Sequence, residues 1–540
     1  MRRRGAGLVV GALASAGVRH LFSLSGNQIL SIYDASIGSG IEIVHTRHEA
    51  AAVHMADAWG RLTEEPGVAL VTAGPGHLNA ISALYGARMG ESPVVFLSGH
   101  APLGLAGRGA FQEMDQVGAA RPVTKAAWVA RDAAAMGDDI ARALHLAQSG
   151  RPGPVHVSLP SDLLEREVDA PAAAPAREAG AGEPPAALGA AIRDALDLLS
   201  AAERPLVLVG PAMGRGRRWR TVEALSEATG IPALLMESPR GVNDPWLHLA
   251  SRSLAEADVV VLLGKRMDYS LRFGEPPAFA RECRFIQVDA DADALAAPER
   301  LAHALAAEPE RVTVELAVAA RSLSWARRDW GDRVMAARRA EPAGWDELRR
   351  STRRPMHPLR VCAAMQPLFD DGAILVCDGG EFGQWVQAGA EARTRLINGL
   401  SGSIGSALPM AAAARLAAPD RAVVAALGDG TFGFHALELD TAARYRLPIV
   451  AVVGNDARWN AEHQLQIQQY GAERTVGCEL SPTRYDELAR ALGAHGEHVE
   501  RPEDLEPALA RAVKSGLPAC VDVAIDGVAA PTYGTARAGH

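Results

Sequence analysis

Two short polar segments near the carboxyl end of the chain have the residue types of a divalent-cation site. Gly428-Asp429-Gly430 follows the apolar run Ala422–Leu427. After an interval of 24 residues, Asn455-Asp456 follows a second apolar run, Pro448–Gly454. Phe434–Arg444, between the two runs, has the composition of a helix. This order predicts a strand–helix–strand unit whose parallel strands end at the same edge of a sheet. Carboxylate oxygens at such an edge suit Mg²⁺ or Ca²⁺.

A further carboxylate lies far upstream, in Thr46-Arg47-His48-Glu49-Ala50. The segment follows the strand-like Ile41–His45 and opens a helix-like stretch that reaches Arg61. Taken alone, Glu49 in the first turn of a helix is explained by its favourable interaction with the helix dipole. Any chemical role for Glu49 therefore depends on the rest of the pattern.

Together these segments resemble the signatures of thiamine-diphosphate enzymes, and a resemblance to the acetolactate synthase-like branch covers nearly the whole chain. It implies that Asp429, Asp456 and the backbone carbonyl of Arg458 hold Mg²⁺, which clamps the diphosphate of the cofactor. It also implies that Glu49 bonds the aminopyrimidine ring and promotes removal of the thiazolium proton. Because the family usually has Asn where this chain has Asp456, we expect the added carboxylate to change the metal affinity.

Several other motifs carry the resemblance through their order and intervals. It implies that Gln28, in Ser25-Gly26-Asn27-Gln28, and Gln112, in Phe111-Gln112-Glu113, contact the substrate or intermediate. Ile404 would form an apolar wedge beneath the cofactor, where synthases usually have Met. The residues that the resemblance assigns to cofactor binding are Gly26, Gly74, Pro75, Gly76, Asn79, Asp378, Gly379, Gly380, Gly402, Ser403, Ile404, Gly428, Gly430 and Thr431.

Two histidines, His77 and His435, could move protons, although a core or surface role explains each of them at least as well.

Part of the middle of the chain resembles a different branch of the thiamine-diphosphate enzymes. Leu263–Pro277 resembles the pattern of 2-hydroxyacyl-CoA lyases and oxalyl-CoA decarboxylases. The resemblance implies a nucleotide site, with FAD, ADP or the CoA adenosine as candidate occupants, and the residues assigned to it are Gly210, Lys265, Arg266 and Asp289. Leu465 also departs from the synthase pattern, which has Trp there. Against a CoA lyase, the tail after Ile525 is short for a segment that closes over CoA.

Composition limits the class of protein. The 540 residues predict three or four domains, and 48% of them are hydrophobic without forming a long apolar span. A net charge of −9 gives no basic signal for nucleic acid, so we expect neither a nucleic-acid nor a membrane partner. Five scattered cysteines form neither a disulfide framework nor a metal-ligand pattern, which favours a reducing cytoplasm. Arg2–Arg4 followed by Gly5–Gly17 imitates a secretory signal, but we expect these residues to form the first helix of the fold.

The expected fold class is α/β, with three doubly wound parallel-sheet domains. The predicted ranges are 1–170 for a pyrimidine-binding domain, 171–187 for a Pro/Ala/Gly-rich linker, 188–325 for a middle nucleotide-binding-like domain, 326–355 for a helical connector and 356–540 for a diphosphate-binding domain. Strands are expected at Pro205–Val209, Ile231–Leu235, Asp258–Leu263, Arg284–Val288 and Ala373–Cys377.

The predicted reaction is decarboxylation of a 2-oxo acid and transfer of the activated aldehyde to a second carbonyl compound, as in acetolactate synthases. A lyase that resembles 2-hydroxyacyl-CoA lyase, oxalyl-CoA decarboxylase or benzaldehyde lyase is the alternative enzyme, and a non-catalytic nucleotide-binding paralogue is the alternative of another class. The resemblance further implies a homodimer or tetramer with its active site at the subunit interface, and it leaves open a small regulatory subunit.

Overall fold

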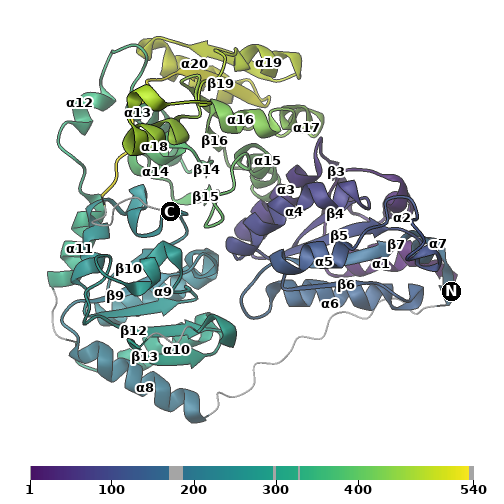
Figure 1. Cartoon of the computed structure of the whole chain (residues 1–540), viewed down its shortest axis with the longest axis horizontal. Helices are drawn as coiled ribbons and strands as arrows, with labels where there is room; N and C mark the ends of the chain where they lie inside the picture. Colours follow the sequence, from purple (N-terminus) through teal and green to yellow (C-terminus); the bar gives the residue numbers. More distant parts are fainter. Residues whose placement is uncertain (1, 170–185, 296–298, 326–328, 534–540) are drawn as a thin grey trace. The chain divides into compact units, whose positions relative to one another are not determined.

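The computed structural model describes residues 2–169, 186–295, 299–325 and 329–533. Its contacts divide the chain into two compact units (Figure 1). The first unit combines Met1–Glu178 with Leu348–Ala529, and the second combines Ala179–Glu347 with Ala530–His540. The first unit contains two six-stranded parallel sheets, and the second contains one five-stranded parallel sheet. The expected α/β class with three parallel-sheet domains is confirmed.

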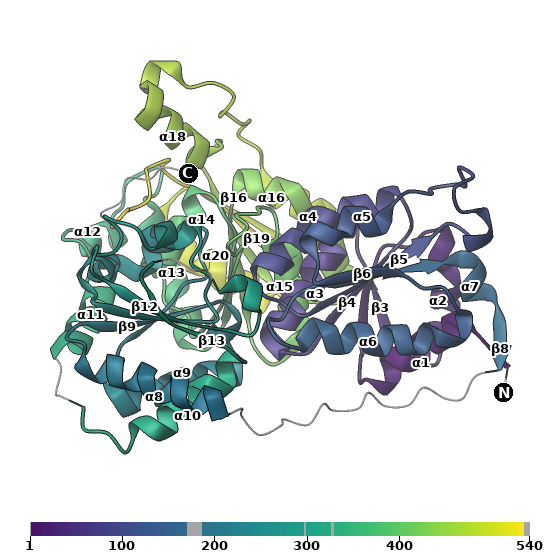
Figure 2. The ribbon, with the colours of Figure 1, turned by 60° about the horizontal axis from the view of Figure 1, so that its bottom comes forward.

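The amino-terminal sheet has the strand order β3-β2-β4-β5-β7-β6. Its apolar strands are buried on both faces, because α1 and α6 pack on one face while α3 and α4 pack on the other (Figure 2). The strands are β2 (His20–Ser23), β3 (Glu42–His45), β4 (Gly67–Val71), β5 (Val94–His100), β6 (Ala126–Val129) and β7 (Val155–Pro160). The helices are α1 (Gly5–Ser15), α2 (Leu30–Ser36), α3 (Glu49–Thr63), α4 (Pro75–Met89), α5 (Gln116–Ala120), α6 (Met136–Gln148) and α7 (Ser161–Glu165). As expected, the residues after Arg4 form a helix, and a short antiparallel pair joins β1 (Arg2–Arg4) to β8 (Glu167–Asp169).

The middle sheet has the order β10-β9-β11-β12-β13. All four strands expected here are found within two residues of their predicted ends: β9 (Pro205–Val209), β10 (Ala233–Leu235), β11 (Val259–Leu263) and β12 (Arg284–Asp289). The fifth, β13 (Leu301–Ala306), was not predicted, because its Leu-Ala-His-Ala-Leu-Ala sequence has helix-forming composition and lacks β-branched residues. The accompanying helices are α8 (Ala186–Ala201), α9 (Gly216–Thr229) and α10 (Pro309–Ala320). Residues 171–185 of the predicted linker lie outside the described residues.

The carboxyl-terminal sheet has the order β15-β14-β16-β17-β19-β18, which repeats the strand order of the amino-terminal sheet. Its strands are β14 (Ile374–Cys377), β15 (Thr394–Ile397), β16 (Val423–Gly428), β17 (Val450–Asn455), β18 (His495–Val499) and β19 (Ala519–Ala524). The longer helices are α13 (Pro358–Asp370), α14 (Glu381–Gly389), α15 (Ala407–Ala417), α18 (Asn460–Tyr470) and α20 (Pro502–Lys514), and α19 (Tyr485–Ala491) is shorter.

One helix prediction needs correction, and the predicted helical connector contains two separate helices. The single helix expected at Phe434–Arg444 is instead a pair, α16 (Asp429–His435) and α17 (Glu438–Arg444). Helix α16 begins directly where β16 ends. The sequence did not predict this early start, because α16 contains glycines, which have low helix propensity. The connector expected to be helical over 326–355 contains only α11 (Asp329–Arg339) and α12 (Trp345–Arg349), since Pro342 and Gly344 separate them. Residues 326–328 of that range lie outside the described residues.

One hydrophobic core joins the two sheets of the first unit. It contains residues of α3 and α4 together with residues of α15 and of the carboxyl-terminal strands. Arg61, at the end of α3, adds a polar link, because it pairs with buried Asp57 and donates to the carbonyl of Ile397 at the end of β15. All five cysteines are buried and free, and no helix among the described residues is long and apolar enough to cross a membrane.

Candidate active site

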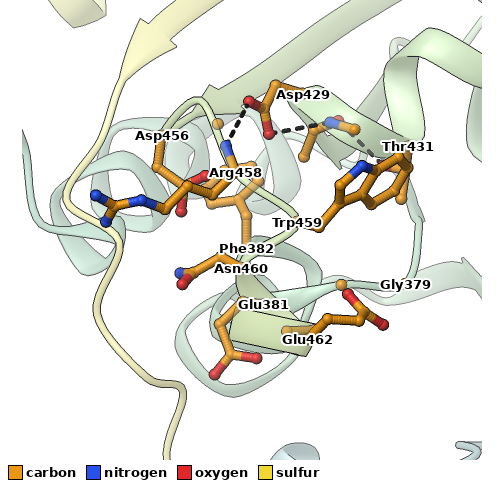
Figure 3. Close-up of a pocket in the computed structure, with 15 residues that line it drawn as sticks. Gly379, Glu381, Phe382, Asp429, Thr431, Asp456, Arg458, Trp459, Asn460 and Glu462 are labelled. Carbon is orange, nitrogen blue, oxygen red and sulfur yellow. Dashed lines mark hydrogen bonds between the residues drawn. The ribbon is translucent and has the colours of Figure 1, made fainter. Parts of the chain in front are cut away.

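A pocket lies at the carboxyl edge of the third sheet (Figure 3). Its lining comes from the segments that follow three adjacent parallel strands, β14, β16 and β17. Neighbouring parallel strands bring such segments to one edge, and the crevice at the point where the strand order reverses is where open α/β sheets bind ligands. The lining residues are Gly379, Gly380, Glu381, Phe382, Gly428, Asp429, Gly430, Thr431, Gly454, Asp456, Arg458, Trp459, Asn460, Ala461 and Glu462.

Two carboxylates share this pocket, as the spacing of the sequence predicts. Asp429 is buried, and its oxygens accept the backbone N–H groups of Gly430 at 3.0 Å and Arg458 at 3.2 Å. Burial raises the pKa of Asp429 to about 6. Burial, and then the charge of Asp429, raises the pKa of Asp456 to about 7. A divalent cation between the two would remove this repulsion, so the donor set fits one.

The backbone around Arg458 adds an oxygen that could reach the same cation. An isolated antiparallel bridge joins Arg458 to Glu479, but its two hydrogen bonds use Ala457 O and Trp459 N. The carbonyl of Arg458 takes no part in that bridge. Ala457 has a φ of 54°, an uncommon backbone conformation for a residue other than glycine, which indicates that the loop is held in a specific shape.

The side chain of Asn455 shapes this loop and is not placed as a ligand. Its oxygen accepts Ala457 N–H at 3.2 Å, and its amide donates to Asp522 at 3.0 Å. His498 contacts the other oxygen of Asp522 at 2.9 Å. Sequence reasoning missed Asp522, although an acidic residue within the apolar strand Ala519–Ala524 was a usable signal.

Glycines let the backbone approach the pocket closely. A Cβ at Gly430 would lie 2.7 Å from the Trp459 ring, and one at Gly379 would lie 2.8 Å from Ile404 Cγ2. Gly380 has a φ of 90° and caps α14, whose amino terminus lines the pocket. Such a terminus favours an anion, so these positions fit a diphosphate.

Asp378 does not direct its carboxylate at the pocket. Both oxygens accept backbone N–H groups, from Gly379, Gly405 and Ala407, at 2.8 to 2.9 Å. Asp378 is fully buried, and burial raises its pKa to about 6. It therefore anchors the turn that carries Ile404.

The turn at Gly402–Gly405 is held from three sides. Asn398 donates to the carbonyl of Ser403 at 3.0 Å, and His435 Nδ1 lies 2.7 Å from the carbonyl of Gly405. Since a carbonyl only accepts, Nδ1 of His435 must carry the proton. His435 thus donates a structural hydrogen bond from Nδ1 to the carbonyl of Gly405.

In the amino-terminal domain, Glu49 is the first residue of α3 and is 8% exposed. Its Oε2 accepts the side-chain amide of Asn79 at 3.0 Å, and its Oε1 lies 3.3 Å from the position of a Cβ at Gly76. Pro75 is at the start of α4, and Gly74 before it has a φ of 54°. The structure therefore places the Gly74–Gly76 loop beside the carboxylate.

Gln28 and Gln112 adjoin the same loop region. Thr72 Oγ1 donates to buried Gln28 Oε1 at 2.5 Å, and a Cβ at Gly26 would collide with Thr72. Gln112 has a φ of 59°, and its carbonyl oxygen would lie 2.9 Å from a Cβ at Gly74. The residues predicted to face the pyrimidine ring and the substrate are thus gathered around one sheet edge.

A buried polar network supports this loop, and sequence reasoning missed its central residue, Gln116. Gln116 Oε1 accepts Gly74 N–H at 3.1 Å, and its amide donates to Ser98 and Ser158. His77 is fully buried against Ser98, and burial lowers its pKa to about 4. His77 therefore stays neutral near pH 7, in a supporting position.

The four residues predicted to face a nucleotide follow adjacent strands of the middle sheet. Gly210 follows β9, Lys265 and Arg266 follow β11, and Asp289 ends β12. Lys265 is 1% exposed, and its Nζ bonds Asp268 and Ser270. The Arg266 side chain is 42% exposed and lies 3.2 Å from Asp291. Of the two basic groups, only Arg266 is exposed enough to meet a ligand.

Family models match three parts of the chain. Residues 3–119 match the N-terminal TPP binding domain of thiamine pyrophosphate enzymes, residues 192–316 match the central domain, and residues 378–523 match the C-terminal TPP binding domain.

Similar proteins match over nearly the full length. An acetolactate synthase large subunit from Mycobacterium tuberculosis is 37% identical over 96% of this chain and 95% of its own length. A 2-hydroxyacyl-CoA lyase 2 from Bos taurus is 33% identical over 92% of this chain and 85% of its own length. A 2-hydroxyacyl-CoA lyase from Oryza sativa is 31% identical over 97% of this chain and 96% of its own length.

Proposed function

Because the chain belongs to the thiamine pyrophosphate enzyme family, we propose that it is a thiamine-diphosphate- and Mg²⁺-dependent enzyme that decarboxylates a 2-oxo acid and transfers the activated aldehyde to a second carbonyl compound. The observation that carries this proposal is the pair Asp429 and Asp456 in one glycine-lined pocket. The higher identity to an acetolactate synthase favours the synthase reaction over the lyase reaction.

At the pocket, Asp429, Asp456 and the Arg458 carbonyl would hold the cation. Backbone groups from Gly379, Gly380, Gly428, Gly430 and Thr431 would accommodate the diphosphate oxygens. When bound, thiamine diphosphate supplies an electron sink that lets a carbon–carbon bond beside a carbonyl group break.

Glu49 would hold a proton at the pyrimidine end of the cofactor. Its carboxylate is buried and Asn79 fixes its orientation, so it is placed to bond a ring nitrogen of the cofactor. Gln28 and Gln112, from two sides of the Gly74 loop, would orient the substrate carbonyl. Ile404 would support the bent cofactor from below. His77 and His435 are held in structural bonds, so we assign them support of these loops.

The competing function is cleavage of a 2-hydroxyacyl-CoA. It is favoured by the Leu263–Pro277 motif and by the exposed Arg266 beside it. A CoA, ADP or FAD moiety at the middle sheet belongs to this proposal. A non-catalytic paralogue is disfavoured, because Glu49 and both pocket carboxylates are present.

The assembly would be a homodimer or tetramer in the cytoplasm, with each active site at a subunit interface and with a small regulatory subunit as a candidate partner. Exposed apolar side chains at Leu78, Phe111 and Phe434, on the segments that carry the proposed cofactor contacts, support burial against another subunit.

The deciding experiment incubates the purified protein with thiamine diphosphate, Mg²⁺ and pyruvate, with and without FAD, and follows carbon dioxide and acetolactate. Formation of both products supports the synthase. If neither appears, while a 2-hydroxyacyl-CoA is cleaved to an aldehyde and formyl-CoA, the lyase is the correct function. Absence of both reactions, together with no binding of thiamine diphosphate in calorimetry, would contradict the proposal.

A further inference from the structure

Glu438 is a buried carboxylate that does not line the pocket. It is the first residue of α17 in the carboxyl-terminal domain and is 2% exposed. Its Oε1 accepts the backbone N–H of Arg47 at 3.0 Å. Its Oε2 accepts the hydroxyl of Thr441 at 2.6 Å. The carboxylate thus bonds the amide of Arg47, which lies in the other sheet domain of the same unit.

The next turn of the same helix holds the backbone just before that amide. Tyr445 Oη accepts His45 N–H at 2.7 Å and donates to the carbonyl of Ile43 at 2.8 Å. Arg444 Nη2 donates to the carbonyl of His45 at 2.6 Å. Together with Glu438, these side chains fix the backbone from the end of β3 to the start of α3.

The residue that follows this fixed backbone is Glu49. Helix α3 begins at Glu49, and His48 caps it by accepting Ala50 N–H through Nδ1 at 3.1 Å. The position of the Arg47 amide therefore determines where the first turn of α3 begins. That turn determines where the Glu49 side chain lies relative to Asn79.

Burying a carboxylate at this position costs free energy, which a purely structural bond would not require. Burial raises the pKa of Glu438, since removing its charge from water is unfavourable. A neutral capping residue on the preceding segment would satisfy the same amide without burying a charge. A charge-assisted bond to a backbone amide does, however, hold the backbone more strongly than a neutral one.

We propose that Glu438 is a positioning residue that sets the catalytic geometry of Glu49 through the Arg47 amide. The inference rests on the proposed function of Glu49. It assigns Glu438 no contact with the substrate or cofactor.

The test compares Glu438→Gln and Glu438→Ala with the unaltered full-length protein. Glu487→Gln is the matched control, because Glu487 is exposed on α19 and pairs with Arg484 at the surface. Hydrogen exchange without cofactor should show faster exchange of the Arg47 amide in both Glu438 variants and no change in β17. Thermal unfolding shows whether each variant folds. If Glu438→Ala does not fold, Glu438→Gln, which keeps the volume of the side chain, still tests the inference.

With thiamine diphosphate and Mg²⁺ bound, kcat and the rate of deuterium exchange at the cofactor C2 position should both fall by up to about a hundredfold in Glu438→Gln. The cofactor Kd should change by less than about threefold, since Glu438 does not line the pocket. In a Glu49→Gln background, Glu438→Gln should cause no further loss, because it acts through Glu49.

Unchanged exchange at Arg47, unchanged kcat, or a loss of equal size in the Glu49→Gln background would each overturn this inference. If the unaltered protein binds no thiamine diphosphate, the proposed function fails, and the catalytic part of this inference fails with it. The amide-exchange result is independent of that outcome.

Discussion

At the scale of single residues, the three carboxylates of the candidate site differ in their surroundings and hence in their proposed work. Asp429 and Asp456 line one pocket, where a bound cation would relieve their mutual repulsion. Glu49 is buried in the other sheet domain, with the neutral amide of Asn79 as its partner. A buried carboxylate bonded to a neutral amide suits a hydrogen bond to a cofactor ring, whereas two carboxylates in one pocket suit a cation.

Glu49 provides the most direct residue-level prediction. Glu49→Gln should lower kcat by at least about a hundredfold, because the side chain no longer exchanges a proton. The unfolding temperature should be nearly unchanged, since the amide retains the size of the carboxylate and the bond to Asn79. Steady-state kinetics and calorimetric unfolding measure the two effects. Glu65→Gln, at an exposed position just after the same helix, is the control, and normal turnover by Glu49→Gln would refute the assignment.

The variant Asp456→Asn tests whether the two pocket carboxylates bind a cation, and the test does not depend on enzyme activity. The substitution removes one of two negative charges, so the affinity of the cofactor-free protein for Mg²⁺ or Mn²⁺ should fall at least roughly tenfold. Titration calorimetry with the metal alone measures this change. Glu462→Gln is the matched control, because Glu462 lines the same pocket outside the pair. Equal affinities for Asp456→Asn and the unaltered protein would show that Asp456 is not a ligand.

At the scale of elements, loops that carry the chemistry are supported by buried polar residues from neighbouring elements. Asp378 anchors the Ile404 turn, Asp522 fixes Asn455, and Gln116 supports Gly74. Each support is itself buried and hydrogen-bonded, so it holds the loop in one conformation.

The buried network under Gly74 predicts a pH dependence of stability. Burial lowers the folded-state pKa of His77 to about 4, below the unfolded value of about 6.5. The unfolded chain therefore binds the proton first, so the stability contributed by neutral His77 is complete above pH 6.5 and is lost as the pH falls towards 4. Relative to pH 7.5, the loss at pH 5 is about 2 kcal/mol. His77→Asn should show a correspondingly smaller drop in unfolding free energy between these pH values, and an identical drop would contradict the assignment.

The buried Asp57–Arg61 ion pair allows a test of the polar link between α3 and β15. Both side chains are at most 2% exposed. Arg61→Ala leaves a buried, unpaired carboxylate and should destabilise the protein by about 3 to 5 kcal/mol. Arg501→Ala, which breaks the exposed pair with Asp504, should have a far smaller effect, because solvent screens that pair. Denaturant unfolding compares the two variants, and equal effects would exclude the proposed link.

At the scale of the whole molecule, the proposed assembly explains an apolar surface on α4. Leu78 and Tyr85 are seven residues apart, so they share one face of the helix, and they are 50% and 43% exposed. Leu78→Asp should shift the protein towards monomers in analytical ultracentrifugation and lower the activity in parallel. Val318→Asp, at a 63% exposed position on α10, should change neither. A monomeric protein with full activity would refute an active site shared between subunits.

The sequence by itself determined the elements that obey local rules. Strands such as β9 and β11 are continuous apolar runs, so their ends were predicted within two residues. Glycine and carboxylate motifs after such strands predicted which residues would gather at each sheet edge. Where composition conflicted with tertiary context, as in β13 and in the early start of α16, prediction failed, because burial beside other strands overrides a weak local preference.

Only the tertiary structure decided how the site is supported. Gln116, Glu438 and Asp522 are ordinary polar residues in the sequence, and their partners lie 42, 391 and 67 residues away. The direction of the Asp378 carboxylate also depended on the folded path of the Ile404 turn. Strand and helix periodicity let the sequence predict which nearby residues lie on the same face of an element. Hydrogen bonds between distant segments form only after the hydrophobic core has brought those segments together, so spacing along the chain does not predict them.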